Sequence, residues 1–319
     1  MPVKKVKSPP PLTPEQSVSE ALTAILRHDF TTLLAWQDIA RSWEDIEGVH
    51  QTRVALRRLR SALSLFANAV PREVSNPWRE ELRWIAGQLG GARDLDVFID
   101  EGLSAVRGQL QLPGEPLLRE LAINQRARCY HDQVVPMLDS DRYQQLIEQF
   151  PAWFEARAWE QATLTDKQRA RLTKPISGYA RKRLDRLARQ VLTAGAQMDR
   201  EDSESMHALR IECKKLRYAA EFFRSLFDGM GEFIGHLKGL QDLLGVMHDV
   251  AVTRHLLDNL LGTDTRRELL LYAGALIGWR ECHYRQLSVR FDAAWAELAA
   301  ARRPWWEQTS VPISAILSS

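Results

Sequence analysis

Apolar residues recur along most of this chain at spacings of three and four, the period that places them on one face of an α-helix. Alternation with a period of two, typical of half-buried strands, is almost absent, and no Asn-Gly or Asp-Gly pair joins two such runs. Proline, glycine and capping residues divide the pattern into segments. The sequence therefore predicts an all-α protein with helices at about 13–43, 50–66, 76–90, 97–106, 117–135, 141–153, 175–196, 204–227, 230–260, 264–287 and 289–302.

The predicted helix at 50–66 has an apolar stripe and a basic stripe, because successive residues are rotated by about 100°. The apolar stripe consists of Leu56, Leu59, Leu63 and Phe66. The basic stripe consists of His50, Arg53, Arg57 and Arg60, and Arg58 lies beside it. No Asp or Glu occurs between positions 50 and 60. We expect one side of this helix to pack and the other to need anions from distant helices or from a ligand.

The same pattern, H-x-x-R-(V/I)-x-x-(R/K)-(R/K)-L-R, recurs 157 residues later. Its basic residues are His207, Arg210, Lys214, Lys215 and Arg217. A solvated helix face with ion pairs inside the helix is the ordinary explanation for such a pattern. Only Glu212 lies between 207 and 217, however, so local acids compensate neither copy. The recurrence indicates that both copies serve one purpose.

Further correspondences extend the repeat beyond the basic helices. The matched pairs are Leu82 with Leu237, Arg83 with Lys238, Asp94 with Asp249, and Arg126 with Arg280. A tandem duplication predicts two helical halves, at 13–160 and 174–305, between a disordered tail at 1–12 and a C-terminal tail at 306–319. A pseudo-twofold arrangement of these bundles would bring both basic helices to one groove.

Composition excludes several classes of protein. The net charge is only +2, so the segregation of charge is more informative than its sum. Three cysteines without C-x-x-C spacing argue against a disulfide framework or a zinc–thiolate site, and the histidines lack metal-ligand spacing. No apolar run approaches the length of a membrane span. We expect a soluble, cytoplasmic protein without cofactor or metal.

The two basic motifs and two L-G-x-x-x-D segments, at 89–94 and 244–249, resemble the CHAD domain, the conserved histidine α-helical domain. The resemblance covers residues 15–305. It implies two pseudo-symmetric four-helix bundles around a basic channel that binds inorganic polyphosphate, and association with polyphosphate granules. It places the polymer on His50, Arg53, Arg57, Arg58, Arg60, His207, Arg210, Lys214, Lys215 and Arg217. Because they recur in both halves, Arg83, Arg126, Lys238 and Arg280 are further candidates.

Arginine suits a phosphate polymer because its planar guanidinium binds two oxygens at once and stays charged, whereas lysine acts as a point charge. His50 and His207 open the predicted basic helices, and either helix capping or phosphate contact accounts for them. Asp94 and Asp249 are expected to orient nearby cations, because no second carboxylate or nucleophile repeats beside them.

Three functions are compatible with these residues. The first is non-enzymatic binding of inorganic polyphosphate, which we favour. The second is a phosphohydrolase acting on polyphosphate or triphosphate; the E-x-E-x-K signature of the triphosphate-tunnel domain fused to many CHAD relatives is absent, and no acidic metal cluster is evident. The third is nucleic-acid binding, disfavoured because no aromatic residue interrupts the stripe at 50–60. The sequence predicts no membrane contact and leaves a homo-oligomer open.

Overall fold

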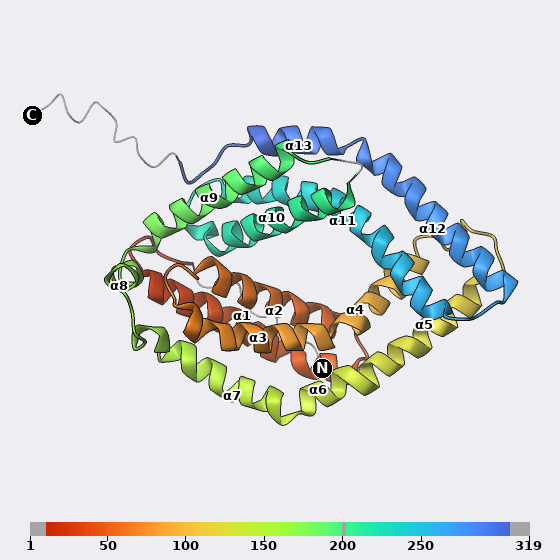
Figure 1. The fold of residues 1–319 in the computed structure, drawn as a ribbon, viewed down its shortest axis with the longest axis horizontal. Helices are drawn as coiled ribbons and strands as arrows, with labels where there is room; N and C mark the ends of the chain where they lie inside the picture. Colours follow the sequence, from red (N-terminus) through yellow and green to blue (C-terminus); the bar gives the residue numbers. More distant parts are fainter. Residues whose placement is uncertain (1–10, 200–201, 307–319) are drawn as a thin grey trace, which may run out of the picture. The chain divides into compact units, whose positions relative to one another are not determined.

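The computed structural model describes residues 11–199 and 202–306, except for the side chains at 203 and 247–249, and these residues are helical without a strand (Figure 1). One isolated bridge joins Ser17 to Pro175. The predicted all-α class is confirmed. The pairing of two pseudo-symmetric bundles around a shared groove stays a prediction.

Backbone contacts group the described residues into two compact units. Unit 1 comprises 22–169 and 246–289, and unit 2 comprises 11–21, 170–245 and 290–306. The predicted second half placed 246–289 with unit 2, but α12 (Arg267–Ser288) packs on α5 (Glu115–Cys129). A Cβ on Gly114 would lie 2.2 Å from the carbonyl oxygen of Glu268, so only glycine permits this approach. Long-range packing, not order along the chain, therefore sets the units.

Unit 1 contains most of α1 and the helices that follow it, together with the end of α11 and α12. Its elements are α1 (Val18–Ser42), α2 (Glu47–Leu65), α3 (Arg72–Gln88), α4 (Gly90–Val97), the π-helical turn Phe98–Leu103, α5, the π-helical turn Tyr130–Val134, α6 (Val135–Asp139), α7 (Asp141–Glu155), a 3₁₀ turn at Ala158–Glu160, α8 (Asp166–Leu172), part of α11 (Met230–Leu261) and α12. The sequence did not predict the two π turns, α4, where it predicted a break, or α8.

Aromatic side chains dominate the core between α1 and α7. Phe30 meets Phe150 and Phe154 edge to face, with ring centroids 5.8 Å apart in each pair. Trp153 packs on Phe150 and on the fully buried Trp159. Such rings bury large apolar areas and favour edge-to-face geometry. This cluster fixes the position of α1 against α7, and α2 packs on α1.

Unit 2 is built on two long helices that pack against each other. Its elements are α9 (Ile176–Ala196), α10 (Ser203–Phe222), a 3₁₀ turn at Arg224–Leu226, the first part of α11, and α13 (Phe291–Ala300). Asp202 caps α10, because its carboxylate accepts hydrogen bonds from the backbone N–H groups of Glu204 and Ser205.

Helix α1 begins later than the capping pattern at Thr13 predicts. The backbone N–H of Ser17 donates to Glu20 Oε2 at 2.9 Å, and the N–H of Glu20 donates to Ser17 Oγ at 3.1 Å. This reciprocal pair is a capping box. The Thr13 N–H donates to Gln16 Oε1 and only closes a preceding turn. Of two successive capping patterns, the second begins the helix.

Parts of both predicted tails pack into unit 2. Residues 1–10 and 307–319 lie outside the described residues. Leu12 is buried, and its carbonyl accepts a hydrogen bond from Ser225 Oγ at 3.0 Å. Trp306 donates from Nε1 to Asp185 Oδ1 at 2.8 Å. The described ends of the chain are therefore part of unit 2.

Candidate anion-binding faces

Helix α2 is fixed by the apolar stripe that the sequence predicts. Leu56, Leu59, Leu63 and Phe66 are all at most 1% exposed. A Cβ on Gly48 would lie 2.4 Å from the backbone nitrogen of Ala40, so glycine is required where α2 starts against α1. This anchoring leaves the basic stripe on the partly exposed side of α2.

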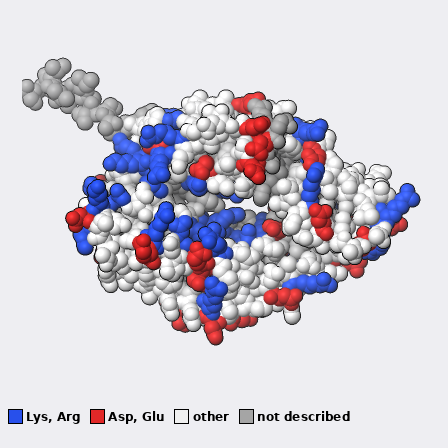
Figure 2. All heavy atoms as spheres, viewed as in Figure 1, with Lys and Arg blue, Asp and Glu red and all other residues white. Residues whose placement is uncertain are grey.

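Arginines from three helices meet along this stripe. We call them, with the histidine, the α2 face: His50, Arg53, Arg57 and Arg60 of α2, Arg79 and Arg83 of α3, and Arg93 of α4. Figure 2 shows Lys and Arg side chains gathered over α2 and α3, with acidic side chains beside them. Arg79 and Arg93 were not predicted. Arg93 could have been found, because it directly precedes Asp94 in the L-G-x-x-x-D segment.

The cations of the α2 face disfavour one another's charge. Burial and then the nearby charges of Arg57, Arg93 and Arg60 lower the pKa of Arg53, against a raising effect of Asp94. Burial lowers the pKa of Arg60, and Arg83 and Arg79 lower it further. Arginine remains protonated at any physiological pH despite such shifts. The face is therefore an accumulation of positive charge that an external anion would stabilise.

Two guanidinium groups show how the face is organised. Arg53 donates from Nη1 to the carbonyl oxygen of Ala86 at 2.6 Å. Ala86 lies in the last turn of α3, which ends at Gln88. Arg57 has a buried Nε without a hydrogen-bond partner among the described residues. A buried donor of this kind is costly unless an acceptor reaches it. A phosphate oxygen is such an acceptor.

His50 lies within α2, which begins at Glu47 after the N-cap residue Ile46, so a capping role is excluded. Burial lowers the pKa of its imidazole, as do the charges of Arg93 and Arg57, while Glu47 and Glu101 oppose this. The free protein therefore favours neutral His50. A phosphate beside it would reverse that preference.

Carboxylates approach the α2 face at its α4 end. Burial raises the pKa of Asp94, whereas Arg53, Arg93 and His255 lower it. Glu101 lies 4.0 Å from Arg93 Nη2. These positions are compatible with the expected role of Asp94 in orienting cations.

Arg58 and Arg126, which the sequence placed in the polyphosphate site, form ion pairs with buried carboxylates and are not part of the α2 face. Arg58 Nε lies 2.7 Å from Oδ1 of Asp29, which is 1% exposed. Arg126 Nε lies 2.6 Å from Oδ1 of the fully buried Asp96, and its guanidinium covers the ring of Tyr130 at 4.8 Å. Unpaired buried carboxylates are very costly, so Arg58 holds α2 to α1 and Arg126 holds α5 to α4.

Arg83 and Arg280 have different settings. Arg83 donates to Glu80 at 2.9 Å, but both side chains are largely exposed, so the pair is weak. Arg280 lies on α12 in unit 1, not in unit 2 as the repeat suggested. A Cβ on Gly102 would lie 2.9 Å from its Nη2, which places Arg280 against the π turn Phe98–Leu103.

The second motif forms the α10 face of unit 2: His207, Arg210, Lys214, Lys215 and Arg217. Lys215 Nζ lies 2.6 Å from Glu212, three residues before it. Arg217 donates from Nη1 to Glu221 at 2.5 Å and from Nε to Gln241 at 2.7 Å. Lys238 is exposed on α11. Carboxylates thus balance part of this face.

Arg183 on α9 has a buried Nε without a hydrogen-bond partner among the described residues, as Arg57 has on α2. Burial lowers the pKa of Arg183, as do the charges of Arg186 and Arg171.

In the described part of the chain, no three His, Cys, Asp or Glu residues are arranged to hold a metal ion. No described helix has the length and apolarity of a membrane span.

Several known proteins are similar to this chain. The uncharacterized protein MT2285 of Mycobacterium tuberculosis (strain CDC 1551 / Oshkosh) is 30% identical over 245 residues, which cover 74% of this chain and 45% of that protein. Rv2226 of strain ATCC 25618 / H37Rv matches to the same extent. The chain spans about half the length of these curated relatives.

Solved structures share the fold. PptA from Streptomyces chartreusis matches with a TM-score of 0.66 and 17% identity, covering 88% of this chain and all of that one. The crystal structure of the CHAD domain from the plant Ricinus communis matches with a TM-score of 0.79 and 26% identity, covering 94% and 97%. The CHAD domain family model matches residues 24–258, about three quarters of the chain. The chain therefore belongs to the CHAD domain family.

Proposed function

We propose that this protein binds inorganic polyphosphate without hydrolysing it, using the α2 face and the α10 face. The observation that carries the proposal is the accumulation of partly buried guanidinium groups on the α2 face, where Arg53 and Arg60 have pKa values lowered by burial and by neighbouring arginines. A chain of phosphates would supply one anion per repeat along a helix whose cations recur every three or four residues.

Binding of such a polymer relieves repulsion that the free protein carries. Bound ligand should therefore raise the free energy of unfolding in proportion to the logarithm of its concentration. Affinity should fall steeply with salt, because each neutralised phosphate releases counterions, as in nucleic-acid binding.

The test is a calorimetric titration of the full chain with polyphosphates of defined length at moderate salt. We expect saturable binding to the protein, and near-complete loss in the double variant Arg57→Glu, Lys214→Glu with the helical content unchanged. Arg285→Glu, on the exposed side of α12, is the matched charge-reversal control and should bind normally. Unchanged affinity in the double variant would remove both faces from the site.

Two further measurements separate the alternatives. Short duplex DNA added at equal phosphate concentration should fail to displace long-chain polyphosphate; displacement would indicate a general nucleic-acid-binding protein. Release of phosphate from polyphosphate or triphosphate in the presence of Mg²⁺ should stay at the level without protein. Release that the double variant abolishes would make the protein a phosphohydrolase.

A further inference from the structure

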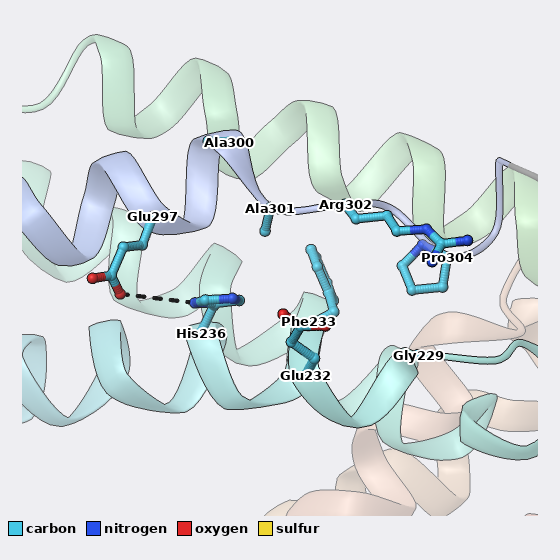
Figure 3. A pocket seen from close by; sticks show the side chains of 9 residues that line it. All are labelled: Gly229, Glu232, Phe233, His236, Glu297, Ala300, Ala301, Arg302 and Pro304. Atoms are coloured by element: carbon cyan, nitrogen blue, oxygen red, sulfur yellow. Dashed lines mark ion pairs between the residues drawn. The ribbon is translucent and has the colours of Figure 1, made fainter.

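Unit 2 contains a cavity of about 310 Å³ between α11 and α13, but its charged side chains need no ligand. Figure 3 shows the imidazole of His236 between Glu232 and Glu297, and His236 Nδ1 lies 3.8 Å from Glu297 Oε2. Glu232, Glu297 and Arg302 are exposed, so water solvates their charges. A stronger indication of a partner lies in unit 1, on the exposed side of α12.

Helix α12 has a buried side and an exposed side. Leu269, Tyr272, Ala273 and Leu276 are buried. The residues within about 60° of Gly274 around the helix axis lie on the opposite side. We call them the α12 face: Arg267, Leu270, Leu271, Gly274, Gly278 and Glu281. Leu270 is 44% exposed and Leu271 is 52% exposed, so the face presents apolar surface to water.

The two glycines of the α12 face are not required by packing within the protein. A Cβ on Gly274 or Gly278 would meet no described atom within 4 Å. Gly114 differs from them, because the backbone of α12 leaves no room for a Cβ there. Glycine inside a helix is less favourable than alanine, because it loses more backbone freedom on folding. Two such glycines beside exposed leucines indicate a surface suited to the close approach of another helix.

We propose that the protein forms a symmetric dimer in which the α12 helices of two copies cross antiparallel at Gly274. A twofold axis at the crossing sets each residue against the partner residue at the same distance on the other side of Gly274. Leu270 then packs on the partner's Gly278, because each lies four residues from the axis. The missing Cβ at Gly274 lets the two helix axes come close together.

Charge complementarity selects this crossing over the other arrangements of two α12 helices. Arg267 and Glu281 each lie seven residues from Gly274, about 10 Å along the helix, so Arg267 meets the partner's Glu281 on both sides of the axis. A parallel pair would set Arg267 against its own copy. An antiparallel crossing two residues further along would set Arg267 against Arg285.

The carboxylate of Glu281 can take part in this pairing without losing its contact inside the protein. Its Oε1 accepts a hydrogen bond from Arg254 Nη2 at 2.7 Å, and the Glu281 side chain is 35% exposed. A carboxylate accepts several hydrogen bonds through its two oxygens, so Arg267 of the partner has an acceptor left.

The experiment is sedimentation velocity of the full chain, without polyphosphate, from about 1 µM to about 1 mM protein, the range of weak complexes. We expect a concentration-dependent dimer. Gly274→Leu should raise its Kd by about tenfold or more, because a large side chain at the crossing separates the helices. Gly178→Leu alters an exposed glycine of α9 and is the matched control, which should dimerise normally. A monomer at every concentration, or a dimer unaffected by Gly274→Leu, would overturn the proposal.

Reversal of two charges tests the register of the crossing. Arg267→Glu and Glu281→Arg should each weaken dimerisation about tenfold, because like charges replace the ion pairs on both sides of the axis. The double variant Arg267→Glu, Glu281→Arg should recover most of the affinity. Loss of the contact with Arg254 would not be repaired by a change at position 267, so a double variant as weak as the single ones would contradict the register.

Disulfide formation locates the crossing point. In a Cys282→Ser background, Gly274→Cys places two thiols at the axis, and oxidation with diamide should give a covalent dimer on a non-reducing gel. Cys282 lies eight residues from Gly274, so the two copies stand about 12 Å from the axis in opposite directions and should form no disulfide. A covalent dimer through Cys282, or none through position 274, would contradict the crossing. Polyphosphate binding should be unchanged in these variants, because the α12 face shares no residue with the α2 face or the α10 face.

Discussion

The α2 face and the α10 face share one sequence pattern but differ in charge balance. On α2, Arg53 and Arg60 are surrounded by further arginines of α3 and α4, and burial adds to the cost of their charges. On α10, Lys215 pairs with Glu212 and Arg217 pairs with Glu221. The same motif, with Arg57 and Arg58 in one copy and Lys214 and Lys215 in the other, therefore has several arginines of neighbouring helices beside it in unit 1 and forms ion pairs within its own helix in unit 2.

The difference shows that the motif determines the positions of the cations along each helix but not whether they are free of ion pairs and able to bind a ligand. Availability depends on which carboxylates the neighbouring helices bring. Arg58 and Lys215 occupy the same motif position, yet Arg58 binds a fully buried carboxylate on another helix, whereas Lys215 is itself largely exposed and binds a carboxylate on its own helix. We expect the α2 face to contribute more of the polyphosphate affinity.

The largest expected effect is the contrast between single charge reversals on the two faces. Arg57→Glu should weaken polyphosphate binding by about 100-fold, because it removes a partly desolvated donor and adds a repelling charge. Lys214→Glu should weaken it by about 10-fold or less, since the α10 face is partly balanced. Calorimetric titration measures both.

Arg57→Gln is the companion variant, because it removes the charge without reversing it. It should give an intermediate loss with an unchanged helical spectrum. Equal losses of polyphosphate affinity in Arg57→Glu and Lys214→Glu would show that the carboxylates of α10 do not weaken binding at the α10 face. Such a result would contradict the proposed difference between the two faces.

The second expected effect is on the free energy of unfolding, at the motif position that Arg58 and Lys215 share. Arg58→Met should lower the free energy of unfolding by about 3 kcal/mol, because it leaves Asp29 charged and buried. Lys215→Met should lower it by less, about 1 kcal/mol or under, since the Lys215 side chain is 54% exposed, although that of Glu212 is only 22% exposed. Urea denaturation followed by circular dichroism measures both, and similar losses would contradict the structural role of Arg58.

The smallest effect is the pH dependence that His50 confers. Burial and nearby arginines lower the pKa of His50 in the free protein, so the stability that its neutral form contributes is present above about pH 6.5 and is lost as the pH falls through the folded pKa. Bound phosphate favours the protonated imidazole. Polyphosphate binding should therefore strengthen severalfold as the pH falls below about 6.5.

A glutamine variant tests this dependence. His50→Gln should flatten the pH profile of polyphosphate affinity, because glutamine does not titrate in this range. A profile that keeps its slope in His50→Gln would exclude His50 from phosphate contact.

Much of the secondary structure could be predicted from local pattern. The helices around the basic motifs, the break near Leu89 and the buried stripe of α2 follow from periodicity and from glycine and proline positions. The start of α1 was wrong by five residues, because two capping patterns stood in succession and the backbone hydrogen bonds of Val18 to Lys174 and of Ile176 to Gln16 hold the chain extended before the second. Helix α8 was missed because seven residues carry too little periodicity.

The sequence by itself determined the all-α class, the family resemblance and the two basic stripes, because each depends on local residue identity and helical period. Only the tertiary structure decided that Arg58 and Arg126 serve buried carboxylates, that Arg79 and Arg93 join the α2 face, and that residues 246–289 belong to unit 1. The physical reason is that charge compensation and packing act between helices far apart in the chain, and a one-dimensional pattern does not record which partners meet.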